Sequence, residues 1–158
     1  MKTVRYAQGL LFYLLLAFSS MTMADDWTLK DKDGMGYSLS GLHGKWVLVN
    51  FWAPWCPTCL QEMPELVTLQ KTHPDLQLIG VAVMYKTRRE VTDIAQNLTY
   101  PVVFGNEDTA ADFGGIPGLP TSFLYTPDGK LAGRHSGPLT LVDIEQAMAG
   151  KSATLFTR

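Results

Sequence analysis

A chain of 158 residues is long enough for one domain with a sizeable core and too short for two comfortable ones. Its 46% hydrophobic and 18% charged residues are typical of a globular protein. The net charge of −2 becomes −4 without Lys2 and Arg5, and no basic run remains in the rest of the chain. This composition argues against nucleic acid and against anionic membrane surfaces as partners of the folded part.

Residues 1–24 have the pattern of a signal peptide. Two basic residues precede an apolar core at 10–18, and Thr22-Met23-Ala24 offers small residues at the −3 and −1 positions of a cleavage site. The uncharged stretch 6–24 spans 19 residues, so an uncleaved N-terminal anchor is the alternative. We expect a periplasmic or otherwise extracytoplasmic protein, soluble if cleaved after Ala24 and anchored in the inner membrane if not.

The segment that follows predicts a small β-hairpin. Trp27-Thr28-Leu29 and Tyr37-Ser38-Leu39 are short strand-like runs, and Asp31-Lys32-Asp33-Gly34 lies between them. A Gly-assisted turn between two such runs is typical of a hairpin.

Residues 47–52 are apolar or aromatic except for Asn50. Such a short run predicts a strand that is buried on both faces, as in a parallel sheet. Pro54 ends it because proline has no amide hydrogen for a sheet. Cys56 and Cys59 then open a stretch with helical spacing of apolar residues.

A thiol at the start of a helix faces unpaired N–H groups and the positive end of the helix dipole, which favour the thiolate. We therefore expect Cys56 to be the exposed nucleophile and Cys59, one turn further in, to be the buried resolving thiol. The two are close enough to form a disulfide. They are the only cysteines, so the chain has no framework of structural disulfides, and the pair needs no further cofactor to act as a redox couple.

The remainder of the chain predicts alternating strands and helices. Strand patterns occur at 76–84, 101–104, 123–125 and 131–136. Helical patterns occur at 87–98, 108–113 and 140–148. Gly150 is a plausible helix end, after which we expect residues 151–158 to be a frayed C-terminal tail.

Residues 51–59, Phe-Trp-Ala-Pro-Trp-Cys-Pro-Thr-Cys, resemble the active-site segment of the thioredoxin superfamily. Residues 60–65, Leu-Gln-Glu-Met-Pro-Glu, look like its exported TlpA-like branch, which includes reductases of cytochrome c maturation. The resemblance implies a thioredoxin-like α/β fold over 25–150, with a central mixed β-sheet flanked by helices. It also implies an N-terminal β-hairpin and a helix-containing insertion at about 87–113.

A second stretch, Gly-Leu-Pro-Thr-Ser-Phe-Leu-Tyr at 118–125, resembles the segment of this family in which the proline is cis and packs against the cysteines. The resemblance implies that the backbone of Leu119 faces the active site and pairs with an extended substrate. It also implies that Pro120 is an apolar lid over the sulfurs. The alternative is an ordinary trans proline at a turn.

Glu62 has two interpretations. Facing inward among apolar residues, its carboxylate would have a raised pKa and could shuttle the proton of Cys59, and the resemblance implies an acidic residue here that influences the thiols. Facing solvent, it would only complement the helix dipole. Thioredoxin usually has a buried aspartate where this chain has Asn50, which cannot exchange a proton. Acid–base duty is therefore shifted toward Glu62 or water.

Three further residues flank the cysteines. We expect Trp55 to be an exposed aromatic residue that shapes the docking surface for substrates. Pro57 and Thr58, between the two cysteines, are expected to tune the redox couple, because about 30 mV corresponds to about 1.4 kcal/mol for two electrons.

These features predict an extracytoplasmic thiol–disulfide oxidoreductase. The TlpA-like resemblance favours a reductase of protein disulfides, supplied by a membrane thiol electron donor, with cytochrome c maturation as a candidate pathway. Membrane contact of the protein itself is expected only if residues 1–24 are not cleaved.

Two alternatives remain open. A thiol peroxidase would use Cys56 on peroxide, but no activating arginine is evident near the motif. A copper-delivery protein would use Cys56 and Cys59, with His135 or Met84 as a further soft ligand. Copper-delivery proteins of this fold usually place three residues between the cysteines, whereas two intervene here, so we expect no metal.

Overall fold

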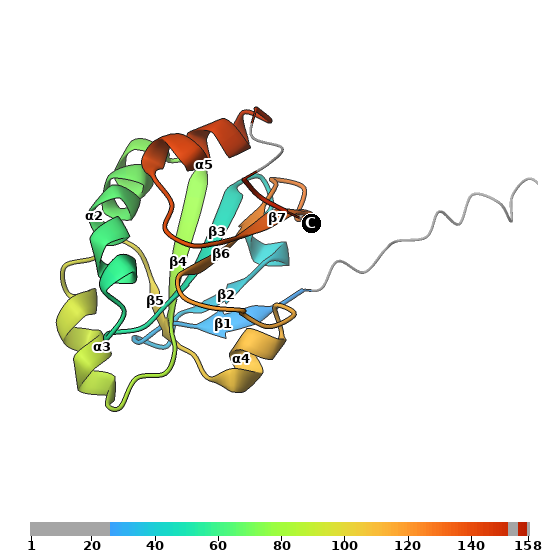
Figure 1. Ribbon diagram of the computed structural model, residues 1–158. Helices are drawn as coiled ribbons and strands as arrows, with labels where there is room; N and C mark the ends of the chain where they lie inside the picture. Colours follow the sequence, from blue (N-terminus) through green and yellow to red (C-terminus); the bar gives the residue numbers. More distant parts are fainter. Residues whose placement is uncertain (1–25, 152–154, 158) are drawn as a thin grey trace, which may run out of the picture.

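The computed structural model describes residues 26–151 and 155–157 (Figure 1). Residues 1–24 lie outside the described residues, so a signal peptide or anchor there stays a prediction. No helix within the described part is long and apolar enough to cross a membrane.

A five-stranded mixed sheet with strand order β5-β4-β3-β6-β7 forms the centre of the molecule. Its strands are β3 (Trp46–Trp52), β4 (Leu76–Ala82), β5 (Val102–Phe104), β6 (Thr121–Tyr125) and β7 (Leu131–Ser136). β4 runs parallel to β3 and β5, whereas β6 runs antiparallel to β3 and β7. The predicted mixed α/β sheet is thus confirmed.

Strand β3 is central and buried on both faces, as its apolar run predicted. Asn50 on β3 is in register with Gly80 on β4 and with Ser122 on β6, and Ser122 is in register with His135 on β7. Residues in register share one face of a sheet. The one polar residue of β3 therefore belongs to a row of polar or small residues that crosses the sheet.

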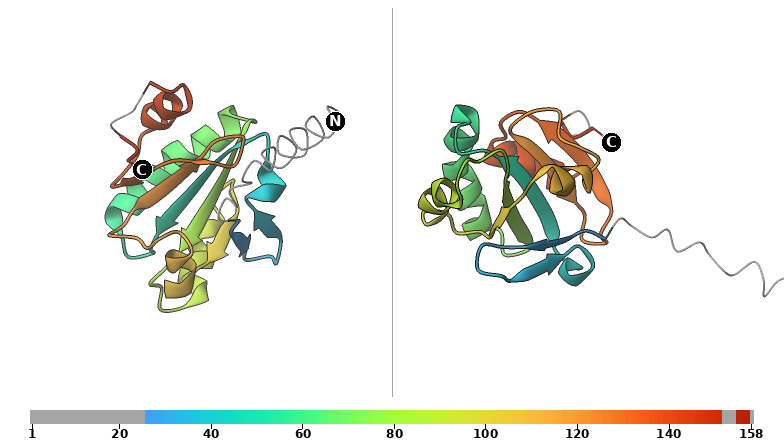
Figure 2. Two further views of the ribbon diagram at one scale, coloured as in Figure 1. Left: turned by 90° about the vertical axis from the view of Figure 1, so that its right-hand side faces the viewer. Right: turned by 90° about the horizontal axis from the view of Figure 1, so that it is seen from below.

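Helices α2 (Pro57–Thr72) and α5 (Leu141–Met148) cover this face of the sheet (Figures 1 and 2). Leu48, Leu78 and Leu124 from three strands pack there against leucines of α2 and Ile144 of α5. Helix α3 (Arg88–Ala95) continues the layer, because Val91 packs in the cluster that holds both cysteines.

The opposite face is covered by the N-terminal hairpin and helix α4 (Glu107–Ala111) (Figure 2). The hairpin consists of β1 (Thr28–Lys30) and β2 (Gly36–Ser38), with a short 3₁₀ helix η1 (Ser40–Leu42) after it. Apolar residues in or next to β1, η1 and α4 pack together on this face of the sheet. They are Trp27, Leu29, Leu39, Ala110 and Phe113. The predicted hairpin is confirmed, and the predicted helix-containing segment 87–113 holds α3, β5 and α4.

The expectation of a frayed C-terminal tail is wrong for residues 155–157. Thr157 exchanges two backbone hydrogen bonds with Arg134 on the edge strand β7, at 2.8 and 2.9 Å. The Phe156 side chain is buried in the same core cluster as the leucines of α2. An apolar side chain that finds a buried place can hold a chain end that has no regular secondary structure.

Candidate active site

The turn from β3 to α2 places the two cysteines at the beginning of a helix. β3 ends at Trp52, and α2 begins at Pro57, so Cys56 is the N-cap residue with extended backbone angles. Pro57 occupies the first helical turn, where a missing N–H is tolerated because it would have no partner within the helix.

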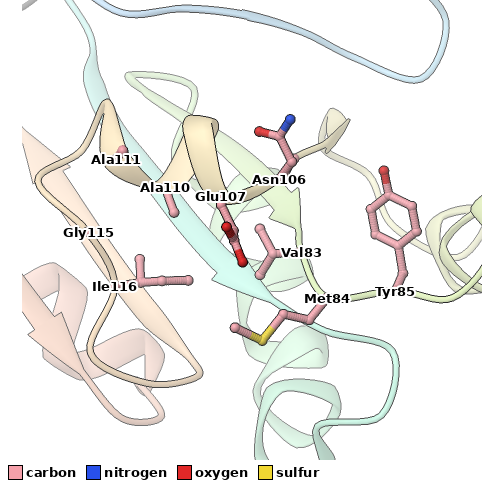
Figure 3. A pocket seen from close by; sticks show the side chains of 10 residues that line it. Val83, Met84, Tyr85, Asn106, Glu107, Ala110, Ala111, Gly115 and Ile116 are labelled. Atoms are coloured by element: carbon pink, nitrogen blue, oxygen red, sulfur yellow. The ribbon is translucent and has the colours of Figure 1, made fainter.

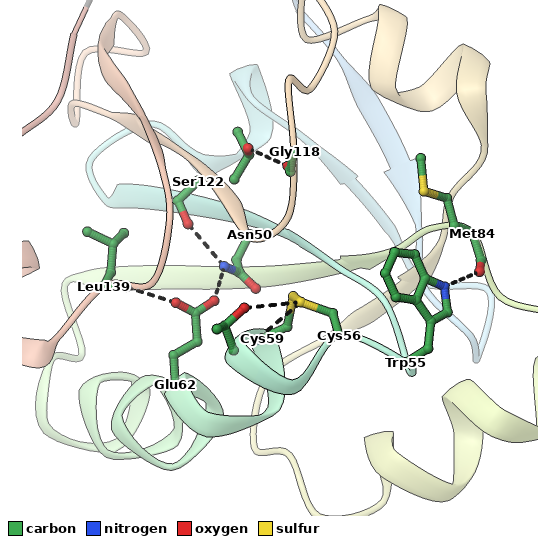
Figure 4. The surroundings of a disulfide bond; sticks show 11 residues. Asn50, Trp55, Cys56, Cys59, Glu62, Met84, Gly118, Ser122 and Leu139 are labelled. Carbon is green, nitrogen blue, oxygen red and sulfur yellow. Dashed lines mark hydrogen bonds between the residues drawn. A yellow bond between two sulfur atoms is a disulfide. The ribbon is translucent and has the colours of Figure 1, made fainter.

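Cys56 and Cys59 form a disulfide with their Cα atoms 5.3 Å apart. Two donors point at the sulfur of Cys56: the backbone N–H of Cys59 at 3.3 Å and the hydroxyl of Thr58 at 3.4 Å (Figure 4). Since a disulfide sulfur carries no hydrogen, it must be the acceptor of both bonds. The same two donors would face a thiolate at this position after reduction.

The prediction of an exposed Cys56 is wrong for the disulfide form. Only 4% of the surface of Cys56 is exposed, and none of Cys59. Both pack in one cluster with Trp52, Met63 and the partly buried Leu119. Cys56 remains the more exposed of the two cysteines, as predicted, although both are buried.

The covering segment precedes β6. The Leu119–Pro120 peptide bond is cis, as the resemblance implied, and Pro120 is buried while Leu119 is half-buried. The hydroxyl of Thr121 donates to the carbonyl oxygen of Gly118 at 2.8 Å, and the N–H of Gly137 donates to that of Pro120. These bonds hold the segment in place beside the disulfide.

Trp55, immediately before Cys56, is 59% exposed, as expected. Its indole N–H donates to the carbonyl oxygen of Met84 at 2.8 Å. Met84 is itself exposed and has a φ of 52°, in the left-handed region that a side chain of this size rarely adopts. The indole therefore ties the surface beside the disulfide to the loop that follows β4.

That loop lines an apolar cavity of about 560 Å³ (Figure 3). Val83, Met84 and Ile116 supply apolar side chains to it, and Asn106 and Glu107 lie at the start of α4 on another side. No sequence pattern indicated this cavity, because its lining residues come from three separate segments. It is a concave, mostly apolar surface, and Met84, whose carbonyl oxygen accepts from the Trp55 indole, is part of its lining.

Glu62 lies on the inner face of α2 and is 4% exposed, which excludes the interpretation as a solvated residue. One carboxylate oxygen accepts from the amide nitrogen of Asn50 at 2.8 Å, and the other accepts from the backbone N–H of Leu139 at 2.9 Å (Figure 4). Burial raises the pKa of Glu62 above its ordinary value, and the two hydrogen bonds lower it by less. Glu62 is thus a buried carboxyl group three residues after Cys59.

Asn50 and Ser122 form a buried polar cluster with Glu62. Both are fully or almost fully buried, and the Asn50 amide nitrogen donates to the Ser122 hydroxyl at 3.0 Å. The sequence singled out Asn50 only as a departure from the thioredoxin pattern and did not indicate Ser122 or the N–H of Leu139. A lone amide in an otherwise apolar strand was the one available signal for Asn50.

A comparison with protein families matches residues 21–134 to the AhpC/TSA family. The chain belongs to the AhpC/TSA family of thioredoxin-like proteins. It is 35% identical over 131 residues to the thioredoxin-like protein YneN of Bacillus subtilis, an alignment that covers 79% of this chain and 76% of YneN. It is 33% identical over 129 residues to the thiol–disulfide oxidoreductase ResA of Geobacillus thermodenitrificans, covering 78% and 72%.

Among solved structures, a thiol:disulfide interchange protein of the thioredoxin family from Chlorobium tepidum superposes with a TM-score of 0.71 at 31% identity. The match covers 80% of this chain and 92% of that protein. Together with the Cys56–Cys59 disulfide, these relatives show that this AhpC/TSA-family chain is a thiol–disulfide oxidoreductase with a thioredoxin-like fold.

The ligands considered for copper delivery lie on different elements of this AhpC/TSA-family protein. His135 is on β7, where its Nδ1 lies 2.9 Å from the carbonyl oxygen of Leu155, and Met84 is in the loop after β4. Within residues 26–151 and 155–157, no three side chains of His, Cys, Asp or Glu form a group that could hold a metal ion.

Proposed function

We propose that this protein is an extracytoplasmic reductase of protein disulfides that uses the Cys56–Cys59 couple. The observation that carries the proposal is the position of the Cys56 sulfur at the N-terminus of α2, where the Cys59 N–H and the Thr58 hydroxyl both donate to it. Hydrogen bonds to an ionised group contribute about 1.5–3 kcal/mol each, so this sulfur is suited to be the thiolate nucleophile.

The cycle begins from the dithiol form. The Cys56 thiolate attacks one sulfur of a substrate disulfide, and the other substrate sulfur leaves as a thiolate, which takes up a proton from solvent. The Cys59 sulfur then attacks the Cys56 sulfur of the mixed disulfide. The second substrate sulfur leaves and takes up the proton that Cys59 gives up. Two electrons have passed to the substrate, and the Cys56–Cys59 disulfide waits for a thiol donor.

Glu62 is proposed to hold the proton that Cys59 releases in this second step. Its burial, its raised pKa and its place one helical turn beyond Cys59 support that role. A carboxyl group with a pKa nearer to neutrality is a better proton carrier at neutral pH than an ordinary glutamate.

Substrate docking is proposed to use the surface around the disulfide. Trp55 is a large exposed aromatic residue next to Cys56, and the apolar cavity beside Met84 can take an apolar side chain of the substrate. Leu119 packs against the cluster that holds both cysteines and is followed by Pro120, and an extended peptide could pair with the backbone of Leu119. Pro57 and Thr58 are proposed to set the redox potential, Thr58 through its bond to the Cys56 sulfur.

The setting of the reaction is also part of the proposal. Residues 1–24 support export, and the TlpA-like segment 60–65 supports the reducing direction with a membrane thiol donor. The natural substrate would be an oxidised Cys-x-x-Cys-His haem-attachment segment of an apocytochrome c, because the Pro57-Thr58 pair is similar to that of cytochrome-maturation reductases.

The deciding experiment is the redox equilibrium of the Cys56–Cys59 couple against glutathione. A potential near that of thioredoxin, about −270 mV, supports a reductase, whereas one near that of the strongest periplasmic oxidants, about −120 mV, would overturn the direction. A matched activity assay would follow reduction of an oxidised Cys-x-x-Cys-His peptide, with Cys56→Ser as the inactive control. Rapid thiol-dependent consumption of peroxide by the same preparation would instead indicate a peroxidase.

A further inference from the structure

Asn50 is a buried side chain whose two polar ends are used unequally. Its amide nitrogen donates to Glu62 at 2.8 Å and to Ser122 at 3.0 Å, so both of its hydrogens are used. Its carbonyl oxygen Oδ1 is fully buried and has no hydrogen-bond partner among the described residues. A buried acceptor without a donor is unfavourable, so a donor supplied in another state of the protein would stabilise that state.

The orientation of this amide follows from its neighbours. Rotating the amide by half a turn would place Oδ1 against the Glu62 carboxylate and would leave the amide hydrogens without those two acceptors. With Glu62 ionised, the carbonyl oxygen must therefore be the end that points away from Glu62. In Figure 4 this oxygen is directed toward the disulfide, while the amide nitrogen is directed toward Glu62 and Ser122.

Reduction of the disulfide creates a donor on that side. Breaking the S–S bond with two electrons and two protons leaves two thiols, of which Cys56 ionises readily at the helix N-terminus. Cys59 has no exposed surface, so its S–H cannot bond to bulk water. In the disulfide form the unpartnered carbonyl oxygen of Asn50, on β3, is directed toward the buried disulfide, so reduction would create a buried S–H group that faces an acceptor.

We propose that Asn50 is a positioning residue for disulfide exchange, whose side-chain carbonyl accepts a hydrogen bond from the Cys59 thiol in the reduced protein. This inference rests on the proposed function, because it concerns the resting dithiol state of the same couple. The bond exists only in the reduced state, so it favours the dithiol over the disulfide. It also turns the Cys59 hydrogen toward β3 and leaves the sulfur lone pairs free for the attack on Cys56.

The S–H stretching band in the Raman spectrum tests this directly. In reduced Cys56→Ser, Cys59 is the single thiol of the chain, and its band should lie at the lowered frequency of a hydrogen-bonded thiol. In Cys56→Ser with Asn50→Leu, the band should move to the frequency of a free thiol. In Cys56→Ser with Ser122→Ala, which removes a partner of the amide nitrogen and keeps Oδ1, it should stay lowered.

A free S–H band in reduced Cys56→Ser would overturn the proposal, even if the Asn50→Leu variant did not fold. The proposal would also be overturned if adding Asn50→Leu to Cys56→Ser left the frequency of the S–H band unchanged. Either result would leave the proposed function intact as long as the wild-type protein exchanges thiols with protein disulfides. A wild-type protein that reduces no disulfide would defeat the proposed function, whatever the position of the band.

The redox equilibrium supplies a second readout that a purely structural role would not change. Asn50→Leu removes the carbonyl oxygen, which in this proposal is hydrogen-bonded in the reduced state and unpaired in the oxidised state. The substitution therefore destabilises the dithiol and removes an unfavourable feature of the disulfide form. The equilibrium constant with glutathione should therefore shift about tenfold toward the disulfide, which corresponds to a potential about 30 mV lower. An unchanged or raised potential in a folded Asn50→Leu protein would contradict the inference.

Discussion

The carboxylate of Glu62 accepts a hydrogen bond at 2.9 Å from the backbone N–H of Leu139, a residue 77 positions further along the chain. The bond joins the helix that carries the cysteines to the segment that leads into α5. Glu65, one turn further on, makes the equivalent bond to the N–H of Leu141 at 2.7 Å, but from an exposed position. The two glutamates therefore form a matched pair for experiments, because both accept a hydrogen bond from a backbone N–H group but only Glu62 is buried.

The buried member of the pair should make stability depend on pH. The pKa of Glu62 is raised in the folded state, chiefly by burial, with Glu65 adding to the rise and His135 opposing it. The folded state therefore binds more protons than the unfolded state between the ordinary glutamate pKa of 4.5 and the raised pKa of Glu62. The contribution of Glu62 to the free energy of unfolding is fully present below pH 4.5 and is lost as pH rises through the pKa of Glu62 in the folded protein.

We accordingly expect Glu62→Gln to gain stability relative to the wild type as pH rises through this window, because the glutamine cannot ionise. The measurement is urea unfolding of both proteins at a series of pH values, with Glu65→Gln as the matched control. A difference between Glu62→Gln and the wild type that is constant from acid to neutral pH would contradict the assignment.

The same pair separates a proton-carrying role from a structural one. We expect Glu62→Gln to slow reduction of a protein disulfide by about 10²-fold at neutral pH, the lower end of the effect of a positioned acid–base group. It should also flatten the pH dependence of the rate, and Glu65→Gln should do neither. Stopped-flow measurement of disulfide reduction from pH 5 to 8 checks this, and equal rates for the two variants would remove Glu62 from the mechanism.

Because Cys56 is proposed to be the nucleophile and Cys59 the resolving thiol, replacing each with serine should give opposite outcomes. Cys59→Ser keeps the Cys56 nucleophile and loses the thiol that releases the substrate, so mixed disulfides on Cys56 should accumulate. Cys56→Ser should form none, because the remaining sulfur has no exposed surface. Non-reducing electrophoresis followed by mass spectrometry of the adducts is the measurement. Adducts on both variants in similar yield would show that Cys59 is also an entry point.

Much of this fold could be predicted from local patterns. The apolar run 47–52 indicated a doubly buried strand, and the Gly-containing turn at 31–34 indicated the hairpin, because each signal lies within a few consecutive residues. The cis bond before Pro120 followed from the resemblance of residues 118–125 to a known segment. The family assignment and the redox pair followed in the same way.

The rest depends on contacts between distant segments. Whether Glu62 faced inward could not be decided from α2 alone, because its partners come from β3 and from the loop before α5. The burial of Cys56 could not be predicted without knowing that the distant residue Leu119 packs against the cluster that holds both cysteines. The docking of Phe156 was missed because three residues carry no periodic pattern, whereas the place they occupy is formed by β7 and the helical layer.

The indole of Trp55 should matter for protein substrates more than for small ones. Trp55→Phe keeps an aromatic ring and removes the N–H that holds the Met84 carbonyl at 2.8 Å, so the loop beside the cavity should become less ordered. Loss of one hydrogen bond of about 1 kcal/mol corresponds to an increase in KM of about fivefold for a protein disulfide, with kcat little changed. Oxidised glutathione, a much smaller disulfide, should be reduced at the wild-type rate. A fall in kcat with both substrates would place Trp55 in the chemical step instead.

The C-terminal segment offers a test of packing that is separate from the chemistry. A Cβ atom added at Gly133 on β7 would lie 2.7 Å from the Cβ of Phe156 and 3.0 Å from its carbonyl carbon, too close for either to remain in place. Gly133→Ala should therefore displace residues 155–157 and lower the free energy of unfolding by about 1–3 kcal/mol. Its local signature is faster hydrogen exchange of the Arg134 amide, which donates to the Thr157 carbonyl at 2.8 Å.

The matched control for this change is Gly36→Ala in strand β2, where an added Cβ would meet no atom within 4 Å. It should alter the unfolding free energy by no more than about 0.5 kcal/mol and leave exchange at Arg134 unchanged. If Gly133→Ala retained both its stability and the protection of Arg134, the docking of Phe156 against the edge strand would be refuted. If it lost both, a segment without regular secondary structure would be shown to seal the edge of the sheet, where unpaired strands otherwise invite association with other chains.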